Sequence, residues 1–451
     1  MAEPSPLPRT AAGNLPALCA VLVAVALASL DTAIANTALP AIAADLNAEP
    51  AESIWVINAY QLAIVATLLP FAALGDLWGP RRVFLGGLVI FTAASLACAL
   101  APGLAWLAAA RVLQGVGAGA LMSVNIALIR LFYPPEKLGR GVGLNALAVG
   151  VAFAVGPSVA SLVLVVADWP WLFAINVPLG LLALAFAWPT LPHSARRGHG
   201  FDVPTAVLTA LCFATLILAL ALAAQREAWP LVLATLAVAL VAGSLLLRRQ
   251  AGHPAPMLPV DLLRRRPFAL SVMTSIASFT TQGLAFVALP FYFEQTLLRD
   301  PVETGFLMSP WPIVVAIAAP IAGRLSDRVA PGLLGGIGLA VLSLGMAALA
   351  LLPVEPSVPD IAWRMILCGI GFGLFQSPNL RALMSSAPIE RSGGASGMVA
   401  MSRLMGQTTG AALVALCFEL AGDRGPGLAL ALGSGFALLA AVTSSLRLWA
   451  R

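Results

Sequence analysis

Charged side chains inside long apolar stretches are the residues of this sequence most able to do chemistry. Asp31 lies deep in the first such stretch, and Arg111 lies within the fourth. A charge at the centre of a bilayer costs about 2.5–3.5 kcal/mol or more, so each one suggests a function. Burial disfavours the ionised form of a carboxylic acid, which can then take up and release protons. We therefore predict a proton site at Asp31; the alternative is a fixed ion pair with a neighbouring arginine.

The composition places these residues in a membrane protein. The chain has 451 residues, of which 60% are hydrophobic and 10% charged, whereas soluble proteins carry about 25% charged residues. The five cysteines are isolated, without CxxC pairs or neighbouring histidines, which argues against disulfides and metal sites. The sequence contains no GxxxxGK[ST] motif and no nucleophile with a nearby base. We expect no enzyme activity, no cofactor and no nucleic-acid partner.

Fourteen uncharged or nearly uncharged stretches are long enough to cross a bilayer, which takes roughly 20 apolar residues. They predict an all-α, polytopic protein with six spans in 1–190, two further spans and a basic loop in 191–267, and six spans in 268–451. The stretches are 15–37, 52–75, 83–102, 104–129, 141–166, 170–190, 203–224, 229–247, 268–292, 304–326, 332–353, 358–383, 393–418 and 427–446.

The distribution of basic residues supports this count. Lys and Arg are retained on the cytoplasmic side of a membrane. Of the 25 Lys and Arg residues, 19 fall in alternate loops and the two tails, 3 in the other loops, and 3 within predicted spans. An even number of spans with both termini in the cytoplasm explains this asymmetry.

The two six-span sets look like copies of each other, as is common in transporters. Asp76 precedes Arg81 and Arg82 after the second span, and Asp327 precedes Arg328 after the tenth. Arg111 follows Asp76 by 35 residues and Arg364 follows Asp327 by 37, and both begin a ladder of glycines. This repeat favours a transporter with two related halves.

The motifs resemble those of the major facilitator superfamily, and within it the fourteen-helix drug:proton antiporter (DHA2-like) branch. The resemblance covers nearly the whole chain and rests on several motifs together. They are Leu30-Asp31-Thr-Ala-Ile-Ala-Asn36-Thr-Ala-Leu39-Pro40, Trp55-Val-Ile-Asn-Ala-Tyr60, Arg111 with Gln114, Gly115 and Gly117, Gly150 through Gly156-Pro157, and Trp171-Leu-Phe-Ala-Ile-Asn176-Val-Pro178-Leu-Gly180.

The resemblance implies the major facilitator fold and roles for the polar residues. It places the helices of Asp31 and Arg111 side by side, so the two could exchange partners when a proton binds; alternatively, Arg111 only ties helices together. Glu294 is a weaker proton-coupling candidate, because Arg299 follows it closely and a surface ion pair would explain it. Arg403 is expected to hold helices together.

The gate, hinge and cavity residues follow from the same resemblance. For the turn of Asp76, Arg81 and Arg82, the alternative to a gate is topology alone, because arginines there also satisfy the positive-inside rule. The expected gate and hinge residues are Asp76, Gly79, Arg81, Arg82, Gly156, Pro157, Asp327 and Arg328. The expected residues of the substrate cavity are Trp55, Asn58, Tyr60, Gln61, Gln114, Asn125, Asn145, Gln282, Arg364, Gln376 and Asn379, some of which would only join helices.

These patterns predict a monomeric, proton-coupled exporter in a bacterial inner membrane, with both termini cytoplasmic. Its partners would be protons, the lipid bilayer and a small-molecule substrate, namely amphiphilic and cationic drugs or toxic compounds. Two alternatives remain open. The first is a dedicated exporter of one endogenous metabolite or of an organic anion attracted by Arg111 and Arg364. The second is a membrane sensor or channel, which the duplicated turns argue against.

Overall fold

The computed structural model describes residues 15–133, 138–192, 202–224, 229–250, 260–353, 355–388 and 392–449, and all regular elements in these ranges are helical. The predicted basic positions Arg9, Lys137, Arg196, Arg197, Arg226, Arg391 and Arg451 lie outside the described residues.

The first bundle of helices covers the N-terminal part of the chain. Proline at the first turn of α4 and α7 fits the helix start, where a backbone N–H has no intrahelical partner. Gly79 separates α3 from α4 with a φ of 88°, a left-handed conformation that favours glycine. The helices are α1 (Leu15–Asp45), α2 (Pro50–Ser53), α3 (Trp55–Trp78), α4 (Pro80–Ala99), α5 (Leu104–Phe132), α6 (Leu138–Val166), α7 (Pro170–Ala174) and α8 (Asn176–Thr190).

Two helices and then a second bundle follow. The two intervening helices are α9 (Val203–Ala224) and α10 (Trp229–Gln250). The second bundle consists of α11 (Val260–Leu263), α12 (Arg266–Phe291), the π-helical turn η3 (Tyr292–Thr296), α13 (Pro301–Met308), α14 (Pro310–Leu325), α15 (Pro331–Ala350), α16 (Val358–Ser385), α17 (Ser392–Ala421), the short 3₁₀ turn η5 (Gly422–Arg424) and α18 (Gly425–Leu446).

Twelve helical segments of the described chain are long and apolar enough to cross a membrane. One of them, Gly397–Leu446, contains most of α17 and all of α18. Helix α9 is not among the twelve, because its apolar part, Val203–Leu216, is shorter than a full span. The structure thus supports twelve candidate spans, and the arrangement of fourteen spans stays a prediction.

Close backbone contacts at glycines recur in the two bundles, as the sequence repeat predicts. A Cβ on Gly117 of α5 would lie 2.8 Å from the carbonyl oxygen of Gly87 in α4, and a Cβ on Gly371 of α16 would lie 2.6 Å from that of Gly338 in α15. Such contacts let helix backbones approach closely in a membrane, where small residues take the place of a hydrophobic driving force. The duplicated glycines therefore fix the same packing in both halves.

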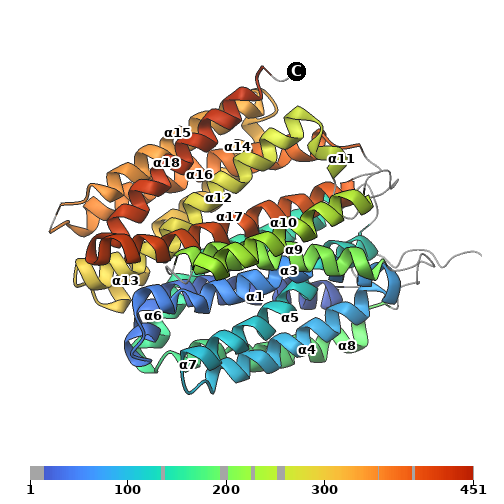
Figure 1. Cartoon of the computed structure of the whole chain (residues 1–451), viewed down its shortest axis with the longest axis horizontal. Coiled ribbons are helices and arrows are strands. Elements are labelled where there is room, and N and C mark those ends of the chain that lie inside the picture. Colours follow the sequence, from blue (N-terminus) through green and yellow to red (C-terminus); the bar gives the residue numbers. More distant parts are fainter. Residues whose placement is uncertain are drawn as a thin grey trace, which may run out of the picture.

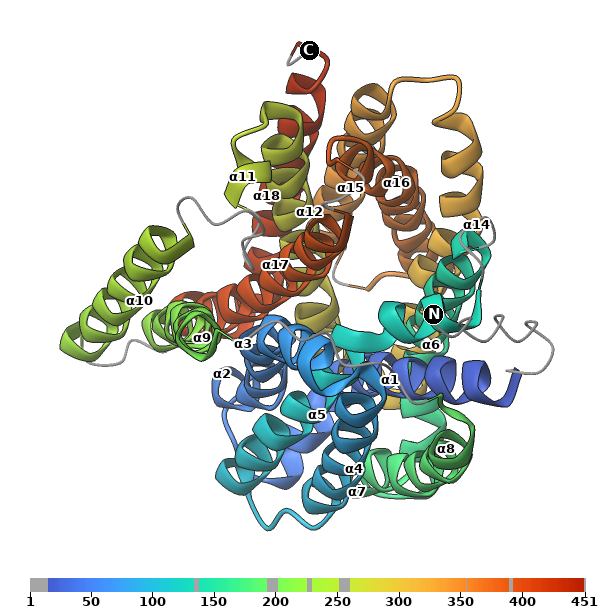
Figure 2. The same ribbon diagram turned by 90° about the vertical axis from the view of Figure 1, so that its right-hand side faces the viewer.

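The two bundles meet through α1 against α12 and α6 against α13. In Figure 1 the helices α15 and α18 of the second bundle slope upward, away from the first bundle, toward the C-terminus marked at the top. Figure 2 shows α9 and α10 beside the contact between α3 and α17. Hydroxyl groups join α6 to the second bundle: Ser158 and Ser309 lie 2.8 Å apart, and Ser161 donates to the carbonyl oxygen of Pro301 at 2.7 Å.

Two adjacent glycines of α4 provide a test of this packing. A Cβ on Gly87 would come within 2.6 Å of the Cβ of Ala120, whereas a Cβ on Gly86 would meet nothing within 4 Å. We expect Gly87→Ala to destabilise the detergent-solubilised protein by about 1–3 kcal/mol through overpacking. Gly86→Ala, the matched control, should be neutral or stabilising by up to about 1 kcal/mol. Thermal unfolding followed by tryptophan fluorescence measures both, and equal midpoints for the two variants would refute the packing argument.

Candidate functional site

A fully buried polar cluster surrounds Asp31 in the middle of α1. The Oδ2 atom of Asp31 forms an ion pair with Nη1 of Arg111, and only 1% of each side chain is exposed. Its Oδ1 atom accepts two further hydrogen bonds, from Nε2 of Gln114 and from Nδ2 of Asn176, each 2.8 Å long. Both carboxylate oxygens therefore have partners on other helices.

Arg111 is held on several sides. Its Nη1 also donates to Oε1 of Gln114 at 2.6 Å, and its Nε donates to the backbone oxygen of Val56 at 2.9 Å. The guanidinium lies 4.0 Å from the ring centre of Tyr60 and 5.5 Å from that of Phe173, within the range of cation–π attraction. Arg111 therefore both pairs with Asp31 and ties α5 to α3.

Five helices position the cluster. Gln114 follows Arg111 by three residues, so the two share one face of α5. Gln114 also donates to the hydroxyl of Ser95 on α4 at 2.8 Å, and Asn176 is the first residue of α8, just after the break that separates α8 from α7. The cluster thus joins α1, α3, α4, α5 and α8 within the first bundle.

The second bundle has no matching acid. Arg364 occupies the repeat position of Arg111, but it pairs with Asp360 one turn earlier on α16 and lies 4.5 Å from the ring centre of Trp363. It also donates to the backbone oxygen of Ala348 at 3.0 Å. Helix α12, which contacts α1 across the interface, contains no acidic residue. The Asp31 cluster therefore breaks the symmetry of the repeat.

A small cavity lies between the two bundles and is separate from the Asp31 cluster. It encloses about 10 Å³, close to the least volume that holds one water molecule. Amides and hydroxyls supply its polar groups, and the Oδ1 atom of Asn36 has no hydrogen-bond partner among the described residues. The lining residues are Thr32, Asn36, Gln61, Phe153, Gln282, Gly283, Phe286, Val287 and Gln407.

Two of the residues expected in a substrate cavity line this one. Gln61 accepts a hydrogen bond from Thr408 on α17 at 3.0 Å, and Gln282 accepts one from Gln407 at 2.9 Å. By contrast, Gln114 and Tyr60 belong to the buried Asp31 cluster, where the hydroxyl of Tyr60 donates to the backbone oxygen of Ala28 at 3.0 Å. The sequence did not single out Gln407.

The remaining predicted cavity residues are dispersed. Asn125 and Asn145 join α5 to α6 at 3.2 Å, and Asn379 accepts from Arg447 at 2.6 Å. Asn379 also donates to the hydroxyl of Ser275, so it belongs to a polar contact between α12, α16 and the end of α18. The others are not among the residues that line the cavity: Asn58 is buried, and Trp55 and Gln376 are partly buried.

The expected gate and hinge residues lie at turns and helix contacts. Arg81 donates to the backbone oxygen of Trp188 at 2.6 Å, which joins α4 to α8, and Arg82 is exposed. Asp327 pairs with Arg381 of α16 rather than with its neighbour Arg328, which is exposed. Asp76 lies in the last turn of α3.

Gly156 and Pro157 lie where α6 contacts both α1 and the second bundle. A Cβ on Gly156 would approach the Cβ of Ala33 within 2.4 Å, and a Cβ on Gly305 of α13 would lie 2.6 Å from the backbone oxygen of Pro157. Proline also removes one hydrogen bond inside α6. This position suits a hinge.

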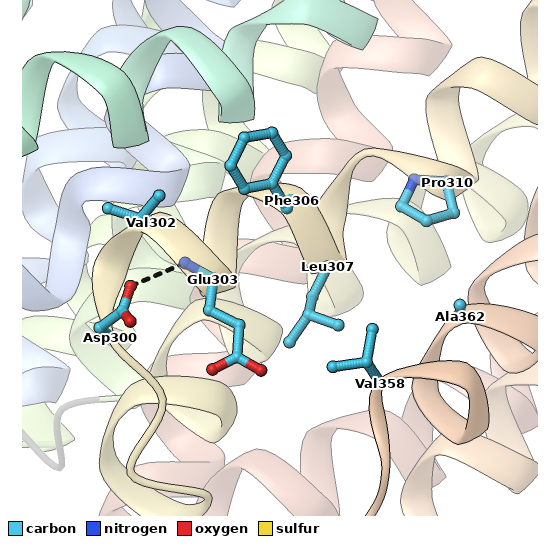
Figure 3. Close-up of a pocket in the computed structure, with 8 residues that line it drawn as sticks. All are labelled: Asp300, Val302, Glu303, Phe306, Leu307, Pro310, Val358 and Ala362. Carbon is cyan, nitrogen blue, oxygen red and sulfur yellow. Dashed lines mark hydrogen bonds between the residues drawn. The ribbon is translucent and has the colours of Figure 1, made fainter.

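Glu294 lies in η3, and its expected ion pair with Arg299 does not form. Arg299 instead pairs with Glu303, four residues further on, because that spacing places both side chains on one side of the chain at the start of α13. Figure 3 shows Glu303 beside an open apolar groove between α13 and α16, lined by Phe306, Leu307 and Val358.

Comparison with known proteins identifies the family. Residues 21–411 match the Major Facilitator Superfamily, so the chain belongs to this family of secondary transporters and is a multi-pass membrane protein rather than an enzyme. It is 50% identical to the "Uncharacterized transporter YebQ" of Escherichia coli K12 over 450 residues, 98% of each chain.

More distant relatives carry functional names. The chain is 28% identical to the "Riboflavin transporter RibZ" of Clostridioides difficile, with 89% of this chain and 87% of the relative covered. It is 30% identical to the "Tetracenomycin C resistance and export protein" of Streptomyces glaucescens, covering 91% and 78%. A crystal structure of a POT family transporter shares the fold, with a TM-score of 0.73 at 13% identity and 94% coverage of both chains.

The Asp31–Arg111 pair provides a stability test. Removing one partner of a buried ion pair leaves an unpaired charge and costs about 3–5 kcal/mol, whereas removing both costs much less. We expect Arg111→Gln to destabilise the purified protein strongly, and Asp31→Asn combined with Arg111→Gln to recover most of the loss. Thermal unfolding of wild type, both single variants and the double variant measures the coupling. Strictly additive effects would contradict the pairing.

Proposed function

We propose that this chain is a proton-coupled antiporter that exports amphiphilic compounds by alternating access. The observation that carries the proposal is the ion pair of Asp31 and Arg111, which is fully buried inside the first bundle. A carboxylate at such a depth costs free energy, so its presence suggests a role in the transport cycle. It is held by donors from α5 and α8, so its protonation state bears on how these helices pack.

The coupling step follows from the hydrogen bonds of Asp31. A proton on one carboxylate oxygen removes the negative charge that balances Arg111 and turns one acceptor into a donor. Arg111 and the amide groups of Gln114 and Asn176 all donate to that carboxylate, so the protonated state favours a different arrangement of α1 against α5 and α8. A ligand shifts such an equilibrium by its different affinity for the two states, and here the ligand is the proton.

The proposed topology has fourteen spans, in the order six, two and six, with both termini in the cytoplasm of a bacterial inner membrane. The distribution of basic residues supports it. So does α9, whose 22 residues are long enough to cross the bilayer core, and so do α17 and α18, which are separate helices joined at η5. We propose that the monomer is the transporting unit and that residues 1–190 and 268–451 form its moving halves.

The proposed substrates are amphiphilic drugs or toxic compounds. The cavity between the bundles holds no more than about one water molecule in this state, so a substrate would bind there after the bundles separate. The amides and hydroxyls beside Phe153 and Phe286 would then suit flat molecules with a few polar groups. The relative named for tetracenomycin export supports efflux. Both carboxylate oxygens of Asp31 already accept hydrogen bonds, so a cationic substrate could bind there only in a state in which Arg111, Gln114 or Asn176 has moved away. The second candidate, export of one metabolite, is supported by the relative named as a riboflavin transporter.

Proton release from energised inverted vesicles tests this proposal. Addition of a transported compound should dequench a pH-sensitive dye in vesicles that contain wild-type protein. We expect Asp31→Asn to reduce this response at least tenfold per folded transporter, because the side chain can no longer bind a proton. The response is divided by the amount of folded protein in the vesicles, since loss of one partner of the ion pair also lowers stability.

Asp202→Asn is the matched control. Asp202 lies at the exposed start of α9, where hydrogen bonds from Thr205 and the charge of Arg249 hold the pKa of its carboxyl below the usual range. This variant should behave as wild type. Full activity of Asp31→Asn would exclude the proposed proton site, and silence of wild type toward lipophilic cations and neutral drugs would favour a dedicated metabolite exporter.

A further inference from the structure

One intramembrane arginine, Arg403, has no acidic partner among the described residues. Three arginines lie inside predicted spans, and two of them are neutralised: Arg111 by Asp31 and Arg364 by Asp360. Arg403 of α17 has no ion pair or hydrogen bond with any other described residue, and its Nε atom is buried without a partner. The expectation that Arg403 holds helices together therefore finds no support in its contacts.

The faces of α17 show where Arg403 lies. Gly406 and Gly410 lie against α12, since a Cβ on either would come within 2.5 Å of a backbone oxygen of that helix. On another face, Thr408 donates to Gln61 of α3 at 3.0 Å. With about 3.6 residues per turn, Arg403 and Gln407 share the face between these two. That face is turned to the space between α3 and α12.

Gln407 confirms which way this face points, because it lines the cavity between the bundles together with Gln61 and Gln282. Arg403 precedes Gln407 by one turn of α17, which is about 6 Å along the helix. In the proposed topology α17 begins on the cytoplasmic side of the membrane, so Arg403, which precedes Gln407 along α17, lies on the cytoplasmic side of the cavity.

We propose that Arg403 binds the anionic group of the substrate as it enters the cavity from the cytoplasm. The ligand class is an amphiphile with a carboxylate or phosphate attached to a flat ring system. A guanidinium binds either group through two parallel hydrogen bonds, and an unpaired one in a poorly solvated site gains more from such a partner than one in water. When the bundles separate and widen the cavity, Phe153 and Phe286 would provide apolar surface for the rings, and the amides of Gln61, Gln282 and Gln407 would contact polar substituents.

This assignment rests on the proposed transport function and narrows it. The residues that line the cavity carry no charge, and Arg403 supplies a positive charge one turn away from Gln407. An anionic group on the substrate would neutralise it, as Asp31 neutralises Arg111. The cationic substrates expected from the sequence would instead be repelled at this point, unless they also carry an acidic group.

Binding to the purified full-length protein in nanodiscs tests the assignment without a proton gradient. The probes are two pairs that differ in one anionic group: riboflavin 5′-phosphate against riboflavin, and rhodamine B against its ethyl ester. Fluorescence titration gives the Kd of each. For at least one pair, we expect wild type to bind the acid about tenfold or more tightly than its partner. Arg403→Gln should remove this preference, and Arg403→Lys should retain part of it.

Arg424→Gln serves as the matched control, because Arg424 is exposed in the turn between α17 and α18 at the opposite end of α17. It should keep the wild-type preference. Equal binding of acid and partner by wild type, binding of neither acid, or a preference that survives Arg403→Gln would overturn the assignment.

The vesicle assay separates this inference from the proposed function. In one outcome, neutral or cationic compounds release protons, Asp31→Asn abolishes the release, and wild type shows no preference for the acids. This result would leave the antiporter proposal intact and refute the role of Arg403. Acid binding that depends on Arg403, without any proton release, would support the binding site and refute proton-coupled transport.

Discussion

The architecture of the first bundle depends on neutralising one carboxylate in a medium that does not solvate ions. Asp31 is nearly inaccessible, and both of its carboxylate oxygens accept hydrogen bonds from donors on other helices. Buried ion pairs are poor sources of net stability, because desolvation offsets much of the attraction. Their persistence is better explained by specificity or by a switch. Here the hydrogen bonds of Asp31 fix the relative positions of α1, α5 and α8, and in the proposed transport cycle protonation of Asp31 would release them.

The duplicated halves make the asymmetry of this cluster informative. Glycine contacts between α4 and α5 recur between α15 and α16, so the helix packing has been retained in both copies. The chemistry has not, since Arg364 turns to an acid on its own helix and α12 carries none. One half therefore holds the buried pair of Asp31 and Arg111, and the other contributes the amides of Gln282 and Gln407 to the cavity between the halves. In the proposed function, this division would separate proton binding from substrate binding.

Much of the fold was predictable from the sequence, and the site was predictable in part. Apolar stretches, the repeat around Arg111 and Arg364, and the family motifs indicated a transporter with two related halves. An ion pair of Asp31 with a neighbouring arginine was one of two interpretations of that residue, and the structure contains such a pair. Fourteen spans were predicted, and twelve candidate segments are found in the described chain. Gln114 was expected in the substrate cavity but belongs to the Asp31 cluster. Asn176 and Ser95 were not assigned to a site, because a neutral polar residue has no distinctive spacing signal.

The hydroxyl contacts between α6 and α13 bear on the speed of the transport cycle. Ser158, Ser161 and Ser309 close the two bundles against each other through bonds that a water molecule can replace almost without loss. Within each bundle, by contrast, helix backbones pack closely at glycines where there is no room for a side chain. Opening this seam therefore exchanges one set of hydrogen bonds for another of similar strength. In the transport cycle proposed above, the seam would add little to the activation barrier for separating the two bundles.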